Sequence, residues 1–288
     1  MITFLLTVIV MLAFAANSLL CRAALVDELS DAGSFTLIRL ISGAATLILF
    51  LVVTGTLKTE KPTSRFKILA GMTLFGYAVL ISYAYLNMAA GTGALILFGA
   101  VQLTLLTLHW WQGERFKMLE VIGIAVSVIG FAWLMLPSAT RPDIWSTVLI
   151  AISGICWALF TALGKHAPSP SSGIAWGFIA ASVISLLVSP LLLSSVTLTS
   201  KGVLLAVSSG AITSGLGYLL WYYVIQKLSL LQAAVSQLSV PVIALVLGSI
   251  MLGEALSFHN ILTSSIILGG IALVFLSRSQ NVHKNETT

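Results

Sequence analysis

The stretches "WWQGERFKMLEVIG" (residues 110–123) and "MLGEALSFHNILTSSIILGG" (residues 251–270) together decide the fold. Each places a Gly-Glu pair beside a long apolar run, and the two acids, Glu114 and Glu254, lie about half a chain length apart. A carboxylate beside a helix end can be catalytic. The second copy favours a structural role, because Gly lets a chain turn out of one helix and Glu is favoured near the start of the next. We therefore interpret both acids as markers of an internal repeat.

The composition indicates an integral membrane protein. Of the 288 residues, 58% are hydrophobic and 8% are charged, whereas soluble domains carry roughly 25% charged residues. The charges fall between apolar stretches of about 20 residues, which is the length of a helix that crosses the hydrocarbon core. A helix satisfies its own backbone groups in lipid, so the sequence predicts an all-α fold of ten transmembrane helices: 2–26, 33–56, 66–88, 92–111, 118–136, 146–165, 173–193, 202–226, 230–251 and 259–277.

The basic residues predict the orientation, because short cytoplasmic loops retain Lys and Arg. With ten spans, the side that carries both termini holds ten of them: Lys58, Lys61, Arg65, Lys67, Arg115, Lys117, Lys165, Lys227, Arg278 and Lys284. The opposite side holds three, Arg22, Arg141 and Lys201. Both termini are therefore expected in the cytoplasm. The net charge of +5 reflects this topology, and we expect no nucleic-acid partner.

Further parts of the chain align with each other at a similar offset. The offset that superimposes Glu114 on Glu254 also places "YAYLNMAAGTGAL" (83–95) on "YVIQKLSLLQAAV" (223–235). At a slightly longer offset, "FAANSLLCR" (14–22) resembles "WALFTALGK" (157–165). The alignments together predict two related halves.

The predicted halves are residues 1–136 and 146–277, with 278–288 left as a cytoplasmic tail. Each contains five spans, and because five is odd the second half enters the membrane from the opposite side. Inverted repeats are typical of secondary transporters that work by alternating access around a site near the midplane.

These features resemble a known family. The ten-helix layout in two halves, "FAANSLLCRAAL" in the first helix, "SFTLIRLISGA" in the second and the Gly-Glu pairs after the fourth and ninth are similar to the drug/metabolite transporter superfamily, in particular its EamA-type bacterial exporters. The resemblance implies a multi-pass carrier of the bacterial inner membrane that exports amino acids, metabolites or toxic compounds. It also implies a central cavity lined by the first, third, sixth and eighth helices. Because the superfamily includes nucleotide-sugar and triose-phosphate carriers, it does not fix the substrate.

Arg39 is the most informative charge, since it lies about two turns into the second span, where an Arg facing lipid costs at least a few kcal/mol. The functional interpretation is that Arg39 contacts a substrate carboxylate or makes a gating interaction on the external side. The structural alternative is that its side chain extends to the interface or pairs with Asp27, Glu28 or Asp31.

Aromatic residues inside the spans are candidates for lining the cavity. Tyr77 and Trp157 are predicted near mid-depth, and Tyr218 and Tyr222 share a helix face because they are four residues apart. Rings with polar tips suit an amphipathic substrate such as an amino acid. The alternative is an interfacial belt, where Trp and Tyr collect.

Three amides, Asn17, Gln102 and Gln237, lie deep in apolar segments. They need partners, because an unpaired polar group there costs roughly 1 to 3 kcal/mol. They either contact substrate or bond to neighbouring helices. Pro241 interrupts the hydrogen bonds of the ninth span, so it is either a hinge or a packing feature.

The sequence favours a transporter over an enzyme. It contains no nucleotide loop and no metal-ligand cluster, and its four histidines are scattered, so we expect no catalytic residue, metal or cofactor. We see no Asp or Glu near mid-membrane, so the sequence favours uncoupled exchange or facilitated export. Coupling through His109 or through the charge of the substrate itself is the alternative. The prediction is a secondary transporter that exports a small organic metabolite, with amino acids favoured. Another metabolite or drug, such as a nucleobase or sugar derivative, and an intramembrane enzyme are the alternatives. The lipid bilayer and a small-molecule substrate are the expected partners, and the oligomeric state stays open.

Overall fold

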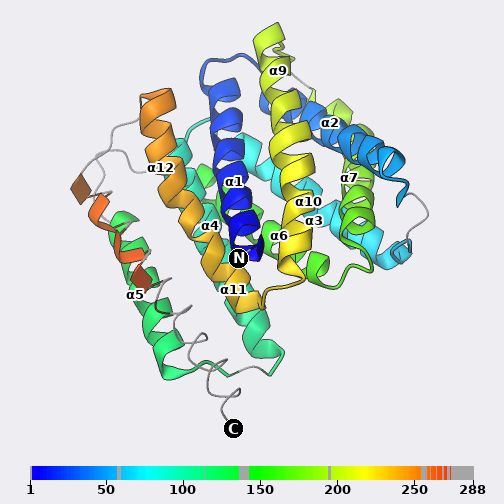
Figure 1. Ribbon diagram of the computed structural model, residues 1–288. Coiled ribbons are helices and arrows are strands. Elements are labelled where there is room, and N and C mark those ends of the chain that lie inside the picture. The colour runs from blue at the N-terminus through cyan, green and yellow to red at the C-terminus, as the bar shows by residue number, and fades with distance from the viewer. Residues whose placement is uncertain are drawn as a thin grey trace.

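The fold is a bundle of helices standing side by side (Figure 1). The computed structural model describes residues 2–56, 60–113, 115–135, 143–193 and 196–253, and part of the segment 258–273. Within these ranges the regular elements are helices, with a single antiparallel bridge between Ser30 and Leu198. The predicted all-α fold is confirmed.

Eight helical runs are long and apolar enough to cross a membrane. They are α1 (Ile2–Val26), α2 (Ala32–Val53), α3 (Ser64–Ala84), α4 (Ala90–Trp111), α6 (Ile144–Lys165), α7 (Pro170–Leu187), the run Ser200–Ile225 and the run Leu230–Met251. The seventh run consists of α9 (Ser200–Ser208), the π-helix η2 (Ser209–Leu216) and α10 (Gly217–Ile225), and the eighth of α11 (Leu230–Gln237) and most of α12 (Ser239–Leu252). A further apolar helix is α5 (Met118–Met135). About half of the predicted span 259–277 lies outside the described residues, so the count of ten stays a prediction.

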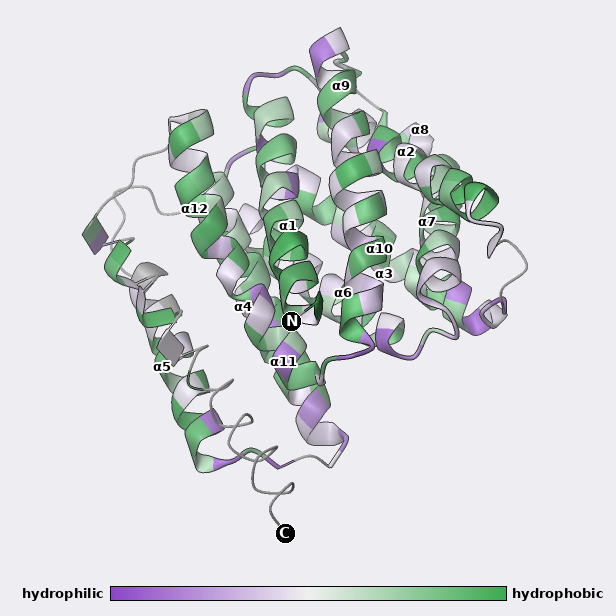
Figure 2. Ribbon diagram, in the orientation of Figure 1, coloured by the Kyte–Doolittle hydropathy of each residue, from purple (hydrophilic) through white to green (hydrophobic). Residues whose placement is uncertain are grey.

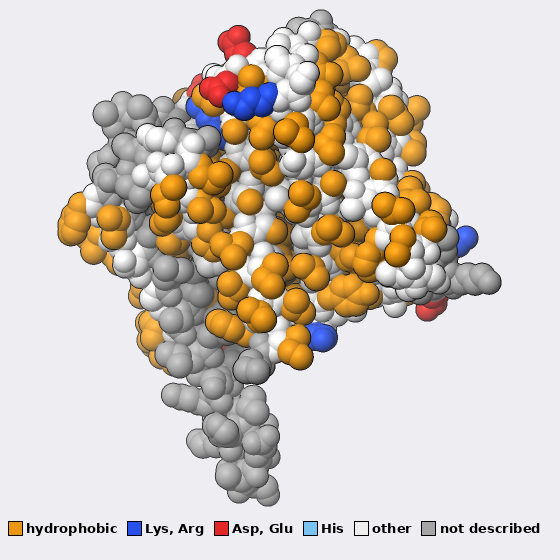
Figure 3. Space-filling model, turned by 45° about the horizontal axis from the view of Figure 1, so that its top comes forward, with side chains coloured by type: hydrophobic (Ala, Val, Ile, Leu, Met, Phe, Trp, Pro, Cys, Tyr) orange, Lys and Arg blue, Asp and Glu red, His pale blue; other side chains and the backbone are white. Residues whose placement is uncertain are grey.

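The outside of the bundle is apolar along the helices. Hydrophobic residues run along the helices and hydrophilic ones gather near their ends (Figure 2). The space-filling view shows apolar side chains over the flank, with the charged side chains near its upper and lower margins (Figure 3). Large side chains such as Phe4, Leu187 and Ile250 are more than 70% exposed. In a soluble protein such a surface would associate, whereas in a bilayer it faces lipid. The chain is a multi-pass membrane protein.

Polar side chains begin many of the helices. A side-chain oxygen accepts a hydrogen bond from a backbone N–H of the first turn at five helix starts, which satisfies groups that have no partner inside the helix. The capping residues are Asp31 for α2, Thr63 for α3, Asp143 for α6, Thr199 for α9 and Ser229 for α11.

Glycine ends two helices in the same way. Gly113 follows α4 with φ +84°, and Gly253 ends α12 with φ +66°. A residue with a side chain adopts this left-handed conformation only with strain. The prediction that both glycines turn the chain out of a helix is confirmed, while the adjacent Glu114 and Glu254 lie outside the described residues.

One predicted boundary was wrong. The predicted span 173–193 ends as α7 at Leu187, and a separate short helix, α8 (Ser189–Leu192), follows. Pro190 has no N–H to donate to the carbonyl of Leu186, and the hydroxyl of Ser189 donates to that carbonyl instead at 2.8 Å. Proline therefore ends the straight helix before the apolar run is finished.

The same tertiary hydrogen bond occurs twice. Arg22, near the end of α1, donates to the carbonyl of Tyr85 after α3 at 2.6 Å, and Lys165, at the end of α6, donates to the carbonyl of Leu228 after α10. Both bonds span the same sequence separation, and the offset between them is the one that aligns 14–22 with 157–165. The five helices α2 to α6 lie between Arg22 and Lys165, so the two bonds belong to opposite ends of the bundle. We call these the Arg22 end and the Lys165 end.

Candidate functional site

Arg39 points into the bundle. Its side chain is 1% exposed, and its Nε donates to Ser214 at 3.0 Å, while Nη2 donates to the hydroxyls of Tyr218 at 2.7 Å and Tyr77 at 3.3 Å. The guanidinium also lies 5.1 Å from the centre of the Tyr77 ring. Its Nη1 has no hydrogen-bond partner.

Arg39 takes neither of the structural alternatives that the sequence left open. Its buried position excludes extension to the interface. The side chain of Asp31 accepts from the backbone of Ser34 at 2.8 Å and of Thr197 at 3.0 Å. No carboxylate of the described residues pairs with Arg39. Since Arg stays protonated in proteins, a full positive charge is buried in the centre.

Asn17 of α1 joins the same cluster and is 1% exposed. Its Oδ1 accepts from the hydroxyls of Ser209, Thr213 and Ser214 at 2.7, 3.0 and 3.2 Å. Its Nδ2 donates to the hydroxyls of Tyr77 at 3.3 Å and Tyr218 at 3.5 Å. One amide thus connects α1 with α3, η2 and α10.

The π-helix is what presents these three hydroxyls together. In an α-helix, with about 100° per residue, Ser214 would lie about 140° around the axis from Ser209. The wider turns of η2 (Ser209–Leu216) bring both residues, and Thr213, onto Asn17. Single-turn π segments within helices are frequent at functional sites. These three residues were not predicted from the sequence, although they are small polar residues in an otherwise apolar span.

Aromatic rings form the other wall of the cluster. The ring of Trp157 lies 4.6 Å from that of Tyr218 and 4.9 Å from that of Tyr77, and Phe14 meets it edge-on at 5.2 Å. The indole Nε1 donates to the Oε1 of Gln237 at 2.6 Å. Phe14 and Trp157 are the first residues of the aligned stretches 14–22 and 157–165, so the predicted halves contribute equivalent positions to the centre.

Gln237 sits at a break in its span. The helix is interrupted at Leu238, between α11 and α12, where the N–H of Leu238 bonds to Val235 at 3.1 Å. Pro241 has no N–H for the carbonyl of Gln237, which accounts for the interruption. The break places the Gln237 amide against Trp157, and the function of Pro241 as a hinge stays a prediction.

Two predicted candidates lie elsewhere. Tyr222 is one turn beyond Tyr218, and its hydroxyl donates to the carbonyl of Phe160 at 3.2 Å. Gln102 is 3% exposed and lines a separate cavity between α4 and α5. The structure therefore brings together six of the eight predicted cavity residues: Asn17, Arg39, Tyr77, Trp157, Tyr218 and Gln237.

We call these six, with Phe14, Ser209, Thr213 and Ser214, the central cluster. It draws on α1, α3, α6 and the η2–α10 run, which correspond to the first, third, sixth and eighth predicted spans named with the resemblance, and also on α2 and α11. Within the described part of the chain, no group of three His, Cys, Asp or Glu could hold a metal ion. The groups of the central cluster that could bind a ligand are a buried cation, hydroxyls, amides and aromatic ring faces.

A multi-pass bundle closed around such a cluster is the architecture of a membrane transporter. Residues 144–276 match the model of the EamA-like transporter family. A Pseudomonas aeruginosa protein of uncharacterised function is 42% identical over 96% of this chain and 95% of its own. A Salmonella typhimurium protein named "Probable amino-acid metabolite efflux pump" is 26% identical over 69% of this chain and 74% of its own.

A solved crystal structure has the same fold. It superimposes with a TM-score of 0.77 over 95% of this chain and 97% of the other, at 18% identity. The chain belongs to the EamA-like transporter family. The predicted family is confirmed.

Proposed function

We propose that the protein exports small molecules that carry a carboxylate, with amino acids as the substrate class, by alternating access around the central cluster. One observation carries the proposal: Arg39 is buried, is 1% exposed, and keeps Nη1 without a partner. Burying a cation without a counter-ion costs desolvation free energy. A substrate carboxylate would supply the negative counter-charge through a charge-assisted hydrogen bond.

The rings of the cluster suit the other end of an amino acid. Trp157, Tyr77 and Tyr218 lie within 4.6 to 6.4 Å of one another, and an ammonium group is attracted to the faces of such rings. The relative named as an amino-acid metabolite efflux pump supports the same substrate class. A single cation is a poor match for a nucleotide sugar, whose phosphates call for several.

The repeated hydrogen bond supports a mechanism. At the Arg22 end, Arg22 holds the carbonyls of Tyr85 and Leu86 at 2.6 and 3.2 Å. At the Lys165 end, Lys165 holds the carbonyl of Leu228. We assign the two contacts as equivalent latches of the inverted halves. In export, the Lys165 latch opens to the cytoplasm, the substrate reaches Arg39, and the Arg22 latch then opens to the outside.

The direct test uses purified protein in liposomes. Radiolabelled amino acids are screened for efflux and counterflow, and any amino acid that moves is compared with its carboxamide and with its 2-hydroxy acid as competitors. The proposal expects the carboxamide to compete at least tenfold more weakly than the 2-hydroxy acid, because only the latter keeps the carboxylate. If no amino acid moves while the protein stays folded, or if the carboxamide competes equally well, the proposal is wrong.

A further inference from the structure

A second buried polar group lies outside the central cluster. Gln102 of α4 is 3% exposed, and its Oε1 has no hydrogen-bond partner. Buried polar atoms in proteins nearly always have a partner, and an amide oxygen can only accept. Gln102 therefore offers an acceptor that calls for a donor from outside the chain.

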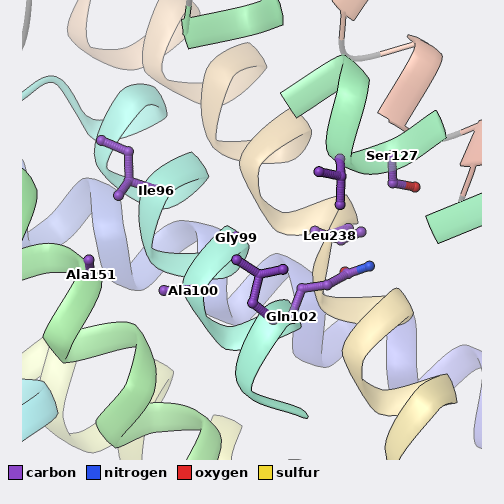
Figure 4. Close-up of a pocket in the computed structure, with 9 residues that line it drawn as sticks. Ile96, Gly99, Ala100, Gln102, Ser127, Ala151 and Leu238 are labelled. Atoms are coloured by element: carbon purple, nitrogen blue, oxygen red, sulfur yellow. The ribbon is translucent and has the colours of Figure 1, made fainter. Parts of the chain in front are cut away.

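Gln102 lines a cavity of about 230 Å³. The walls come from α4, α5, α6 and Leu238, and the Gln102 side chain extends from α4 along the side where Leu238 and Ser127 lie (Figure 4). The hydroxyl of Ser127 already donates to the carbonyl of Ile267 at 3.3 Å. The rest of the lining is almost wholly apolar, so the amide of Gln102 is the polar group left for a ligand.

The cavity opens sideways and continues along the bundle. Two of its lining residues, Leu103 and Val128, are 57% and 40% exposed. The same two residues line a second hollow of about 470 Å³ that extends along the α4–α5 seam to Trp110 and Phe116. From Gln102 to Trp110 is eight residues, or about 12 Å along a helix. Because Gln102 is near the middle of a spanning helix, the opening faces hydrocarbon.

We propose that this seam is a lateral binding site for an elongated molecule dissolved in the membrane, with a hydrocarbon body and one hydrogen-bond donor at its end. The body fills the apolar seam between α4 and α5, and the donor, a hydroxyl or amide N–H, meets the Oε1 of Gln102. A plain hydrocarbon tail fits the walls equally well but leaves that oxygen without a partner. The site is distinct from the central cluster, and the proposal does not depend on the transported substrate.

The test uses a long-chain alcohol as the probe. Hexadecanol with a diazirine in its chain is incorporated into liposomes that contain the purified protein, activated by light, and its attachment sites are mapped by peptide mass spectrometry. Unlabelled hexadecanol and its methyl ether, which has the same chain but no donor, serve as competitors. We expect labelling concentrated on α4 and α5, with the alcohol competing about two- to tenfold better than the ether, as one neutral hydrogen bond would give.

Variants separate the polar contact from the cavity. Gln102→Met is expected to abolish the preference for the alcohol, and Leu103→Trp to fill the mouth and suppress the labelling of α4 and α5. The matched control is Leu186→Trp, which changes a lipid-facing leucine of α7 that is 52% exposed and should leave the labelling unchanged. Labelling spread evenly over the lipid-facing helices, or equal competition by alcohol and ether on the unmodified protein, would overturn the proposal even if a variant failed to fold.

Discussion

Replacing Arg39 by Gln should weaken transport strongly. A hydrogen bond to a charged group contributes about 1.5 to 3 kcal/mol. Its loss corresponds to roughly a ten- to 150-fold rise in the substrate concentration needed for half-maximal counterflow. Arg39→Lys keeps the charge but loses the planar fork of donors, so it should fall between Gln and the unmodified protein.

The same substitution should not destabilise the fold. The hydroxyls that contact Arg39 keep other partners, because Tyr218 donates to Tyr77 at 3.1 Å and Ser214 donates to the Oδ1 of Asn17 at 3.2 Å. Removing the guanidinium also removes a buried charge without a counter-ion. Replacing even well-paired buried ions by hydrophobic residues is often neutral or stabilising, and the neutral Gln likewise avoids burying a charge. We therefore expect Arg39→Gln to unfold at the same temperature or higher.

The assay therefore has two readouts on the same preparation: amino-acid counterflow in liposomes and thermal unfolding in detergent. Lys201→Gln, which removes an exposed positive charge at the start of α9, is the control and should change neither. A loss of transport together with a clear loss of stability would show that Arg39 is a structural residue. Unchanged transport in Arg39→Gln would refute its contact with the substrate.

Three further predictions follow from the cluster and the latches. Asn17→Asp places a carboxylate beside Arg39, since both residues contact Tyr77 and Tyr218, and should raise the unfolding temperature while abolishing counterflow; counterflow that survives would contradict the need for a free cation. Arg22→Ala should favour opening at the Arg22 end, and the adjacent, buried Cys21 should then react with maleimide about tenfold faster. Lys165→Ala should favour opening at the other end and lower the labelling rate of Cys21. Equal effects of the two variants would exclude opposed latches. Because no carboxylate of the described residues pairs with the buried cation, amino-acid efflux should proceed at the same rate with and without a pH gradient across the liposome, and a rate that follows the gradient would place a proton carrier in the site.

Much of the fold follows from the sequence for a simple reason. Length and apolar composition determine which segments can cross lipid, and eight of the ten predicted spans have crossing runs within a few residues of their predicted starts. The ends were less predictable. Apolar composition continues past Leu187, but the missing N–H of Pro190 stops the helix there. The end of this helix is therefore determined by local hydrogen bonding, which hydropathy does not report.

The site was partly predictable. Polar side chains inside apolar spans are unfavourable facing lipid and therefore turn toward the bundle interior, so Asn17, Arg39 and Tyr218 could be named from the sequence. Which of them meet could not. Hydropathy does not distinguish a π-turn from an α-turn, so the convergence of Ser209 and Ser214 on one amide became visible only in three dimensions. Gln102 has the same sequence signal as Asn17 and lies in a different cavity, because the rotation of each helix about its axis is decided by packing.

The hydrogen bonds of the cluster give an argument for an acidic substrate that is separate from charge. Arg39 brings donors only, and its Nη1 has no hydrogen-bond partner. The Oδ1 of Asn17 already accepts from three hydroxyls, and an amide oxygen has two lone pairs, so it has no capacity left for Nη1. A carboxylate accepts about four hydrogen bonds and donates none, which suits this unpartnered donor. An amine alone would bring further donors to a group that needs an acceptor. The carboxylate is therefore the group we expect the site to recognise, and the rest of the substrate is left to the ring faces.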